Sequence, residues 1–189
     1  MTNSNDKIIV SSYRSNGLYF SVGVSSSTGK VVRISLPKPD KNQADKEITS
    51  RYPNYELSQD YEDIARDIAM IYRGKRADLK IEQLELDVDK SNRQLPVKSG
   101  FMRDVLIETY KIPYGEVETY KSLAEKVSTR AYRAVGTVMA RNPFPFIIPC
   151  HRVVKSDLTI GNYGGGSQMK REILKKEGIH LSGDKIIKK

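Results

Sequence analysis

Thiol chemistry has a single possible position in this chain. Cys150 is the only cysteine among 189 residues, His151 follows it directly, and the one other histidine is His180. The thiolate is the reactive form of cysteine, and the pKa of a free thiol is about 8.5, so a nucleophile near neutral pH needs a neighbour that lowers that pKa. A histidine and a nearby arginine can do this. The alternative is a buried apolar residue, which is the commonest fate of a free cysteine.

The segment that leads to the thiol, Arg141–Cys150, is largely apolar and contains three prolines in the sequence RNPFPFIIPC. Proline fixes φ, so these residues predict a rigid path that ends at the sulfur. We expect Cys150 to lie in a shielded site of fixed geometry. The ordinary alternative is a buried strand that contains a cysteine.

Two short helices are predicted before this segment, at Thr119–Val127 and Arg133–Arg141, and a brief turn between them suits a helix-turn-helix. On the second helix, one face is apolar (Ala134, Val135, Val138 and Met139) and the opposite face is small and basic (Arg133, Thr137, Ala140 and Arg141, with Gly136 beside it). Small residues let a backbone approach DNA, and arginines reach phosphates or bases. An ordinary helix pair in a core would show the same spacing, so both interpretations stay open.

The basic charge is concentrated in the second half of the chain. Residues 98–189 carry 17 basic and 9 acidic side chains, whereas residues 1–97 carry 15 and 14. From Lys126 to Lys155 there are six basic residues and no acidic one. Such asymmetry favours a polyanionic partner for the second half, although a solvated basic surface has the same composition.

Composition excludes several classes of protein. One cysteine rules out an internal disulfide, and Cys150, His151 and His180 are too few for a cysteine-rich zinc site. The N-terminus lacks the basic start and apolar run of a signal peptide, and no apolar stretch approaches the roughly 20 residues that span a bilayer. We expect a soluble cytoplasmic protein without a metal, a cofactor or a membrane partner.

The pattern of elements predicts an α+β fold with two domains. In the first domain, residues 1–97, we expect a small antiparallel sheet followed by a polar linker, a helix and one further strand. Their ranges are Lys7–Tyr13, Leu18–Ser25 and Lys30–Leu36 for the sheet, Pro37–Asp45 for the linker, Leu57–Tyr72 with Ser58 as its cap for the helix, and Ile81–Val88 for the last strand. The second domain, residues 98–189, is predicted to be helical, with the helix-turn-helix between flanking helices at Phe101–Tyr110 and Met169–Glu177.

Several motifs of the second half resemble one known family. They are Ile148–Val154 (IPCHRVV), Arg133–Gly136 (RAVG), Asn142-Pro143, Gly161–Gly166 (GNYGGG), and Ile112–Gly115 (IPYG) with Thr119-Tyr120. Together they resemble the O6-alkylguanine-DNA alkyltransferases from about Gly100 to Gly178. In residues 1–97 only the layout is similar, a small sheet followed by a helix. Two departures are a glycine at position 164, where the family often has serine, and the lack of the zinc site that many members have in the N-terminal half.

The resemblance implies a role for each matching residue. Cys150 would take the alkyl group, His151 would be its base, and Glu177 would orient the histidine. Tyr120 would help to neutralise the leaving guanine, and Arg133 would fill the gap left by a flipped nucleotide. The remaining implied residues are Asn142 beneath the thiol, Tyr163 and Gly164 in the loop over the base, Val153 and Met139 in the substrate pocket, and Gly136, Thr137, Ala140 and Arg141 on the DNA.

The implied activity is a direct transfer of the alkyl group from O6-alkylguanine in double-stranded DNA to Cys150. The thioether product is stable, so each protein molecule would act only once. We expect the protein to be a monomer. There are two alternative functions. A non-catalytic sensor of alkylated DNA would not need Cys150, and a Cys-His hydrolase would show turnover and would not need a basic helix pair.

Overall fold

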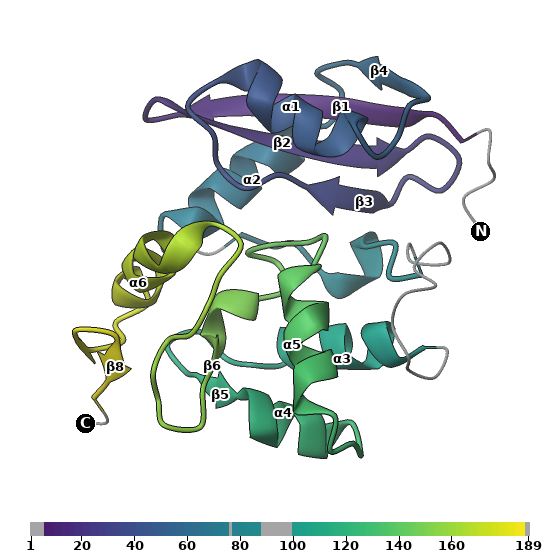
Figure 1. Ribbon diagram of the computed structural model, residues 1–189. Coiled ribbons are helices and arrows are strands. Elements are labelled where there is room, and N and C mark those ends of the chain that lie inside the picture. Colours follow the sequence, from purple (N-terminus) through teal and green to yellow (C-terminus); the bar gives the residue numbers. More distant parts are fainter. Residues whose placement is uncertain (1–5, 76, 88–99, 188–189) are drawn as a thin grey trace. The chain divides into compact units, whose positions relative to one another are not determined.

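The computed structural model describes residues 6–75, 77–87 and 100–187, which divide into two compact units (Figure 1). The first unit contains the described residues up to 87 together with residues 143–147. The second unit contains residues 100–142 and 148–187. The predicted domain boundary at residue 97 lies outside the described residues and stays a prediction. Both units combine helices with strands, which confirms the predicted α+β class.

A four-stranded sheet organises the first unit, in the order β3-β2-β1-β4. The strands are β1 (Ile8–Ser15), β2 (Leu18–Ser25), β3 (Val31–Ile34) and β4 (Tyr55–Leu57). The first three strands are antiparallel, as predicted, and β4 adds a parallel edge beside β1. A parallel neighbour requires a crossover connection, and α1 (Lys41–Thr49) provides it.

The two helices of this unit, α1 and α2 (Glu62–Tyr72), cover opposite faces of the sheet (Figure 1). Ile48 of α1 packs with Ile8, Val10 and Val32. α1 lies so close to β2 that a Cβ on Gly23 would come within 2.7 Å of Ile48 Cγ2, so only glycine fits there. On the other face, the ring of Tyr72 at the end of α2 lies 5.5 Å from that of Phe20.

Three predictions for the first unit are wrong. Most of the polar linker Pro37–Asp45 is α1, because Asp40 Oδ1 accepts a hydrogen bond from Gln43 N and caps a helix with few apolar residues. α2 begins at Glu62 after Tyr61, and Ser58 Oγ accepts from Asp60 N instead of capping the helix. The segment Ile81–Gln83 is a 3₁₀ turn, η1, and only an isolated bridge joins Leu84 to Val31. Residue 88, at the end of that predicted strand, lies outside the described residues.

Residues 143–147, which lie shortly before Cys150 in sequence, belong to the first unit. Ile34 N donates a hydrogen bond to Pro143 O over 2.8 Å, and the ring of Phe146 packs edge-on against Tyr72 at 5.4 Å. Phe146 has φ +75°, a region that a bulky side chain adopts only when its surroundings impose it. The packing of Phe146 and the hydrogen bond of Pro143 fix the path of this segment.

The second unit is mainly helical, as predicted. Its elements are α3 (Phe101–Tyr110), β5 (Glu118–Thr119), α4 (Tyr120–Lys126), α5 (Tyr132–Ala140), η2 (Cys150–Arg152), β6 (Val153–Val154), α6 (Gly166–Lys176), β7 (Leu181–Ser182) and β8 (Lys185–Ile186). The four predicted helices are present, and α6 begins three residues earlier than expected. Two parallel pairs, Glu118 with Val153 and Thr119 with Val154, join β5 to β6.

The predicted helix-turn-helix corresponds to α4 and α5, which pack against each other and against α3. Thr119 Oγ1 accepts from Ser122 N and caps α4, while a five-residue link with Ser128 at φ +55° leads to α5. Val135, Val138 and Met139 are buried, so the apolar face of α5 points into the unit. Arg133 and Ala140, on the opposite side, are exposed.

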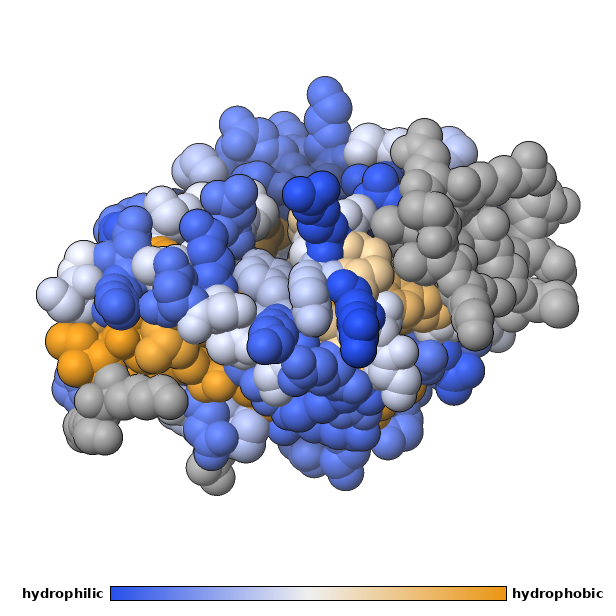
Figure 2. Space-filling model, turned by 60° about the horizontal axis from the view of Figure 1, so that its bottom comes forward, coloured by the Kyte–Doolittle hydropathy of each residue, from blue (hydrophilic) through white to orange (hydrophobic). Residues whose placement is uncertain are grey.

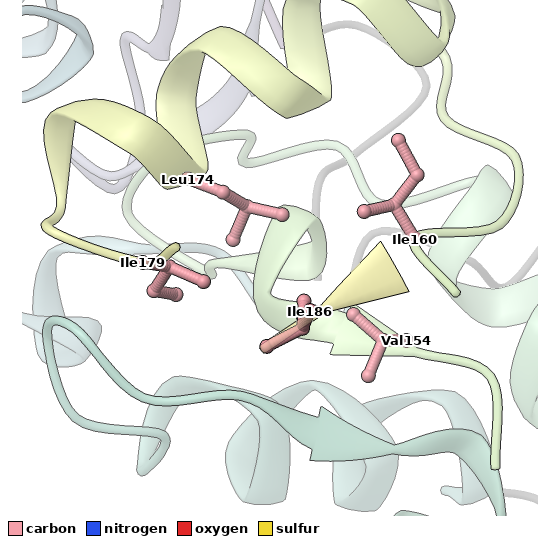
Figure 3. Packing of buried hydrophobic residues seen from close by; sticks show 5 residues of the cluster. All are labelled: Val154, Ile160, Leu174, Ile179 and Ile186. Carbon is pink, nitrogen blue, oxygen red and sulfur yellow. The ribbon is translucent and has the colours of Figure 1, made fainter. Parts of the chain in front are cut away.

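A separate apolar cluster holds α6 and the C-terminal hairpin together (Figure 3). It consists of Val154 of β6, Leu174 of α6, Ile186 of β8, and Ile160 and Ile179 from the connecting loops. All five side chains are buried and point toward one another. Because Val154 lies four residues after the cysteine, this cluster fixes the strand that follows Cys150–Arg152.

The surface of the molecule that faces forward in Figure 2 is mostly hydrophilic. In the part of the chain that the structure describes, no helix has the length and apolar character needed to cross a membrane.

Candidate active site

Cys150 begins η2, a single 3₁₀ turn between Pro149 and β6. Cys150 N donates to Ile148 O, and Arg152 N donates to Pro149 O, both over 2.8 Å. The side chain of Asn142, at the end of α5, donates through Nδ2 to Ile148 O over 2.8 Å. These bonds hold the turn in place, and the cysteine is 7% exposed.

Behind the thiol, a buried ionic cluster surrounds Glu177. His151 Nε2 lies 2.9 Å from Glu177 Oε1. Arg152 donates to both oxygens of the same carboxylate, from Nε over 2.8 Å and from Nη2 over 2.9 Å. Arg152 Nη1 also donates to Ile112 O, and its guanidinium lies 5.6 Å from the centre of the Tyr114 ring. The Ile-Pro-Tyr-Gly turn is thereby joined to the cluster.

The cluster determines the charge of its members. Burial alone would raise the pKa of Glu177, but hydrogen bonds from His151 and Arg152 outweigh it and lower that pKa to about 2. Burial lowers the pKa of His151, and the bond to Glu177 opposes this only in part. At neutral pH the site therefore contains a carboxylate and a neutral imidazole, and an imidazole in that form accepts a proton.

A buried cation, Lys170 of α6, contacts the strand that follows the turn. Its side chain is fully buried, and its Nζ donates to Val153 O over 2.6 Å. Burial lowers the pKa of Lys170 to about 8, and the negative charge that Cys150 carries when ionised opposes that shift. Lysines are almost never fully buried without a partner; the Val153 carbonyl is the partner here, and the charge of Lys170 lowers the pKa of Cys150.

The thiol itself is a poor acid in this environment. Burial raises the pKa of Cys150, while the hydrogen bond from Asn142 and the charge of Lys170 lower it, with burial having the largest effect. The cysteine is therefore protonated at rest. A base has to take its proton during any reaction, and His151 is the adjacent one.

The thiol opens into a cavity of about 650 Å³ within the second unit. Tyr120 and Met139 line this cavity beside the sulfur, and Asn162, Tyr163 and Gly164 contribute the loop before α6. α5 contributes Tyr132, Arg133, Gly136, Thr137 and Ala140. Lys155 and Gly161 complete the lining. None of the lining residues that the structure describes is acidic, so the cavity suits an electron-rich or anionic guest.

Most residues predicted from the sequence therefore meet at one place. Tyr120, Arg133, Gly136, Thr137, Met139, Ala140, Tyr163 and Gly164 line the cavity with Cys150. His151, Glu177 and Asn142 lie outside the lining and act on the turn. Arg141, the C-cap of α5, and Val153 are not part of the lining, and the carbonyl of Val153 already accepts from Lys170. In the described part of the chain no three His, Cys, Asp or Glu side chains form a group suited to a metal.

Sequence reasoning expected the nearby arginine to act on the thiol, whereas Arg152 binds the Glu177 carboxylate. It gave no role to five other residues of the site: Lys170, Lys155, Tyr132, Gly161 and Asn162. Arg152 stands two positions after Cys150, but nothing local indicates that it binds a carboxylate 25 residues away. Lys170 resembles any other lysine of a basic helix. The proximity of Tyr132 to Arg133 and of Lys155 to the Cys150 segment was the only available signal.

The α+β fold and this site define a class of protein with one buried thiol, a histidine–glutamate pair behind it and a helix pair beside the cavity. Residues 100–179 match the family model described as the DNA binding domain of 6-O-methylguanine DNA methyltransferase. The chain is 54% identical over 74 residues to the methylated-DNA–protein-cysteine methyltransferase of Pyrobaculum aerophilum, a match that covers 39% of this chain and 49% of the relative. The corresponding protein of Methanosarcina barkeri is 36% identical over 122 residues, which cover 64% of this chain and 70% of the relative.

A crystal structure of the O6-methylguanine-DNA methyltransferase of Pyrococcus kodakaraensis matches with a TM-score of 0.64 and 26% identity, over 91% of this chain and 99% of that one. In the sequence comparison, this chain spans only about half the length of the relatives from Pyrobaculum aerophilum (49%) and Methanothermobacter thermautotrophicus (58%). The chain belongs to the O6-methylguanine-DNA methyltransferase family.

Proposed function

We propose that this protein repairs DNA by transferring the alkyl group of O6-alkylguanine irreversibly to Cys150. The observation that carries the proposal is the buried thiol at a cationic cavity, with the His151–Glu177 pair directly behind it. Family membership supports the same reaction, since the similar proteins are named methylated-DNA–protein-cysteine methyltransferases.

In the proposed reaction the Cys150 sulfur attacks the alkyl carbon, the S–C bond forms and the C–O6 bond breaks. His151 accepts the thiol proton, through a water where needed, and the bond pair leaves with guanine, which takes up a proton. The carboxylate of Glu177 stabilises the imidazolium that forms. Lys170 favours the thiolate through its charge.

Tyr120 is proposed to serve the leaving group. Its ring lines the cavity with Cys150, and burial together with the cysteine charge raises its pKa. A phenol with a raised pKa keeps its proton and can donate a hydrogen bond to guanine as negative charge develops there. Of the remaining cavity residues, Met139, Tyr163 and Gly164 would enclose the flipped base, while Asn142 would hold the turn. The carbonyl of Val153 keeps a second lone pair for the guanine amino group.

Double-stranded DNA is the proposed partner, bound by α4 and α5 as a helix-turn-helix. The oxygen to be dealkylated lies inside the base stack, so the nucleotide has to rotate into the cavity, at a cost of a few kcal/mol. Arg133 would enter the duplex and fill the gap, a role supported by its exposure at the start of α5 and its part in the cavity lining. Gly136, Thr137, Ala140 and Arg141 continue the proposed DNA face. We further propose that the protein acts as a cytoplasmic monomer.

The decisive experiment is the intact mass of wild type and Cys150→Ala after incubation with a duplex that carries O6-methylguanine. The expected result is one added methyl group on wild type alone, saturating at one per protein. No added mass while the DNA stays bound would place the protein among sensors of alkylated DNA. Continued turnover of an ester substrate would place it among hydrolases.

A further inference from the structure

The proposed function leaves the cation at position 155 without a role. Lys155 directly follows β6 and lines the cavity. Of the lining residues that the structure describes, only Arg133 is also positively charged, and it comes from α5 on a different part of the chain. We propose that Lys155 binds a phosphodiester group of the flipped nucleotide, a contact separate from the insertion of Arg133 into the duplex. This inference rests on the proposed function.

The backbone at Lys155 is fixed by a tight turn. Lys155 N donates to Thr159 O, and Leu158 N donates to Lys155 O, both over 2.9 Å. The turn has Leu158 at φ +66°, and Val154, directly before it, lies in the buried cluster of Figure 3. The starting point of the side chain is therefore well defined.

The stem of Lys155 passes beside Gly161. A Cβ on Gly161 would lie 3.5 Å from Lys155 Cγ, 3.7 Å from Lys155 Cε and 3.8 Å from Tyr120 Cε2. The stem thus runs past the glycine, and the Tyr120 ring reaches the same glycine. An amphipathic side chain of this kind covers apolar surface with its stem and keeps its ammonium group in water, and Lys155 is both exposed and part of the cavity lining.

The ammonium group of Lys155 has no ion-pair partner within the described residues. The acidic residue that its charge reaches is Asp157, whose pKa is lowered mainly by hydrogen bonds from Thr159 and to a smaller extent by Lys155. Asp157 Oδ1 already accepts from Thr159 N over 2.9 Å and from Thr159 Oγ1 over 2.7 Å. Lys155 is therefore a pre-positioned cation beside a cavity with no acidic lining.

A flipped nucleotide supplies the matching anion. Its base enters the cavity, while its two phosphates remain joined to the duplex and come to lie at the opening. Lysine binds phosphate as a point charge, so the contact would add affinity without base selectivity. A free alkylated base has no phosphate and would not use this contact.

The test compares Lys155→Ala with Lys175→Ala, which removes an exposed lysine of α6 outside the cavity. Methyl transfer from a duplex with O6-methylguanine should slow about tenfold in Lys155→Ala, and the salt dependence of duplex binding should fall by about one counterion. With free O6-benzylguanine, the rate of Lys155→Ala should fall by a factor at least about fivefold smaller than on the duplex. Lys175→Ala should react at the wild-type rate with both substrates. Equal losses on both substrates, or an equal loss in Lys175→Ala, would overturn the inference.

A neutral methylphosphonate at each phosphate flanking the lesion identifies the contact directly. At the phosphate that Lys155 binds, the modification should slow wild type but cause little further loss in Lys155→Ala, because both changes remove the same interaction. Fully additive losses at both flanking phosphates would refute the contact while leaving alkyl transfer intact. Failure of wild type to accept a methyl group from any duplex would instead refute the proposed function.

Discussion

Replacing Arg152 with methionine should destabilise the protein strongly, although Arg152 does not line the cavity. Methionine keeps most of the side-chain stem but removes three donors, two to Glu177 and one to Ile112 O. Glu177, 7% exposed, would be left as a buried carboxylate with only His151 beside it. Removing one member of a buried ion pair typically costs about 3–5 kcal/mol. For a chain of this length the expected fall in melting temperature is about 6–20 °C.

The assay is urea unfolding at pH 7, with Lys175→Met as the surface control. A double variant with Glu177→Gln separates the pair from the rest of the cluster, because glutamine removes the charge and keeps an acceptor for His151. The double variant should lose about 1–3 kcal/mol less than the sum of the two single losses. A loss below about 0.5 kcal/mol in Arg152→Met, as for an ordinary surface change, would refute the reasoning. So would strict additivity in the double variant.

Three further outcomes are expected. The pKa of Glu177 is about 2 in the folded state, below its ordinary value of 4.5. Its contribution of about 3 kcal/mol to stability is therefore present above pH 4.5 and is lost as the pH falls toward 2. The melting temperature should change less between pH 6 and pH 2 in Glu177→Gln than in wild type. Lys170→Met removes a charge that lowers the pKa of Cys150, so the pH profile of iodoacetamide labelling should move to higher pH, and an unmoved profile would contradict that role. Arg133→Ala should slow repair of duplex DNA by about tenfold or more and slow the reaction with free O6-benzylguanine less; equal losses would contradict insertion into the duplex.

The sequence alone was sufficient to predict the elements whose side chains follow a clear local pattern. The strand Leu18–Ser25 and the helix Phe101–Tyr110 have the predicted bounds. Cys150 could be proposed as the nucleophile because no other cysteine competes with it. The short helices near 120 and 133 could also be predicted, since their buried residues recur at helical spacing.

Tertiary structure decided what local pattern does not encode. α1 forms in a polar segment because Asp40 caps it and Ile48 packs against Gly23 of β2, a contact made only after folding. Apolar and polar residues alternate after residue 81 as in a strand. Within the described residues, however, the only bridge that this segment forms joins Leu84 to Val31, and Ile81–Gln83 is a 3₁₀ turn.

The ionic surroundings of the thiol also depend on the fold. Arg152 and Lys170 are charged residues, and charged residues are expected at the surface unless a partner compensates for their burial. Their partners are the Glu177 carboxylate, 25 residues along the chain from Arg152, and the Val153 carbonyl, 17 residues from Lys170. Sequence identifies the sulfur, but only the fold brings together the histidine, the carboxylate and the buried cations around it.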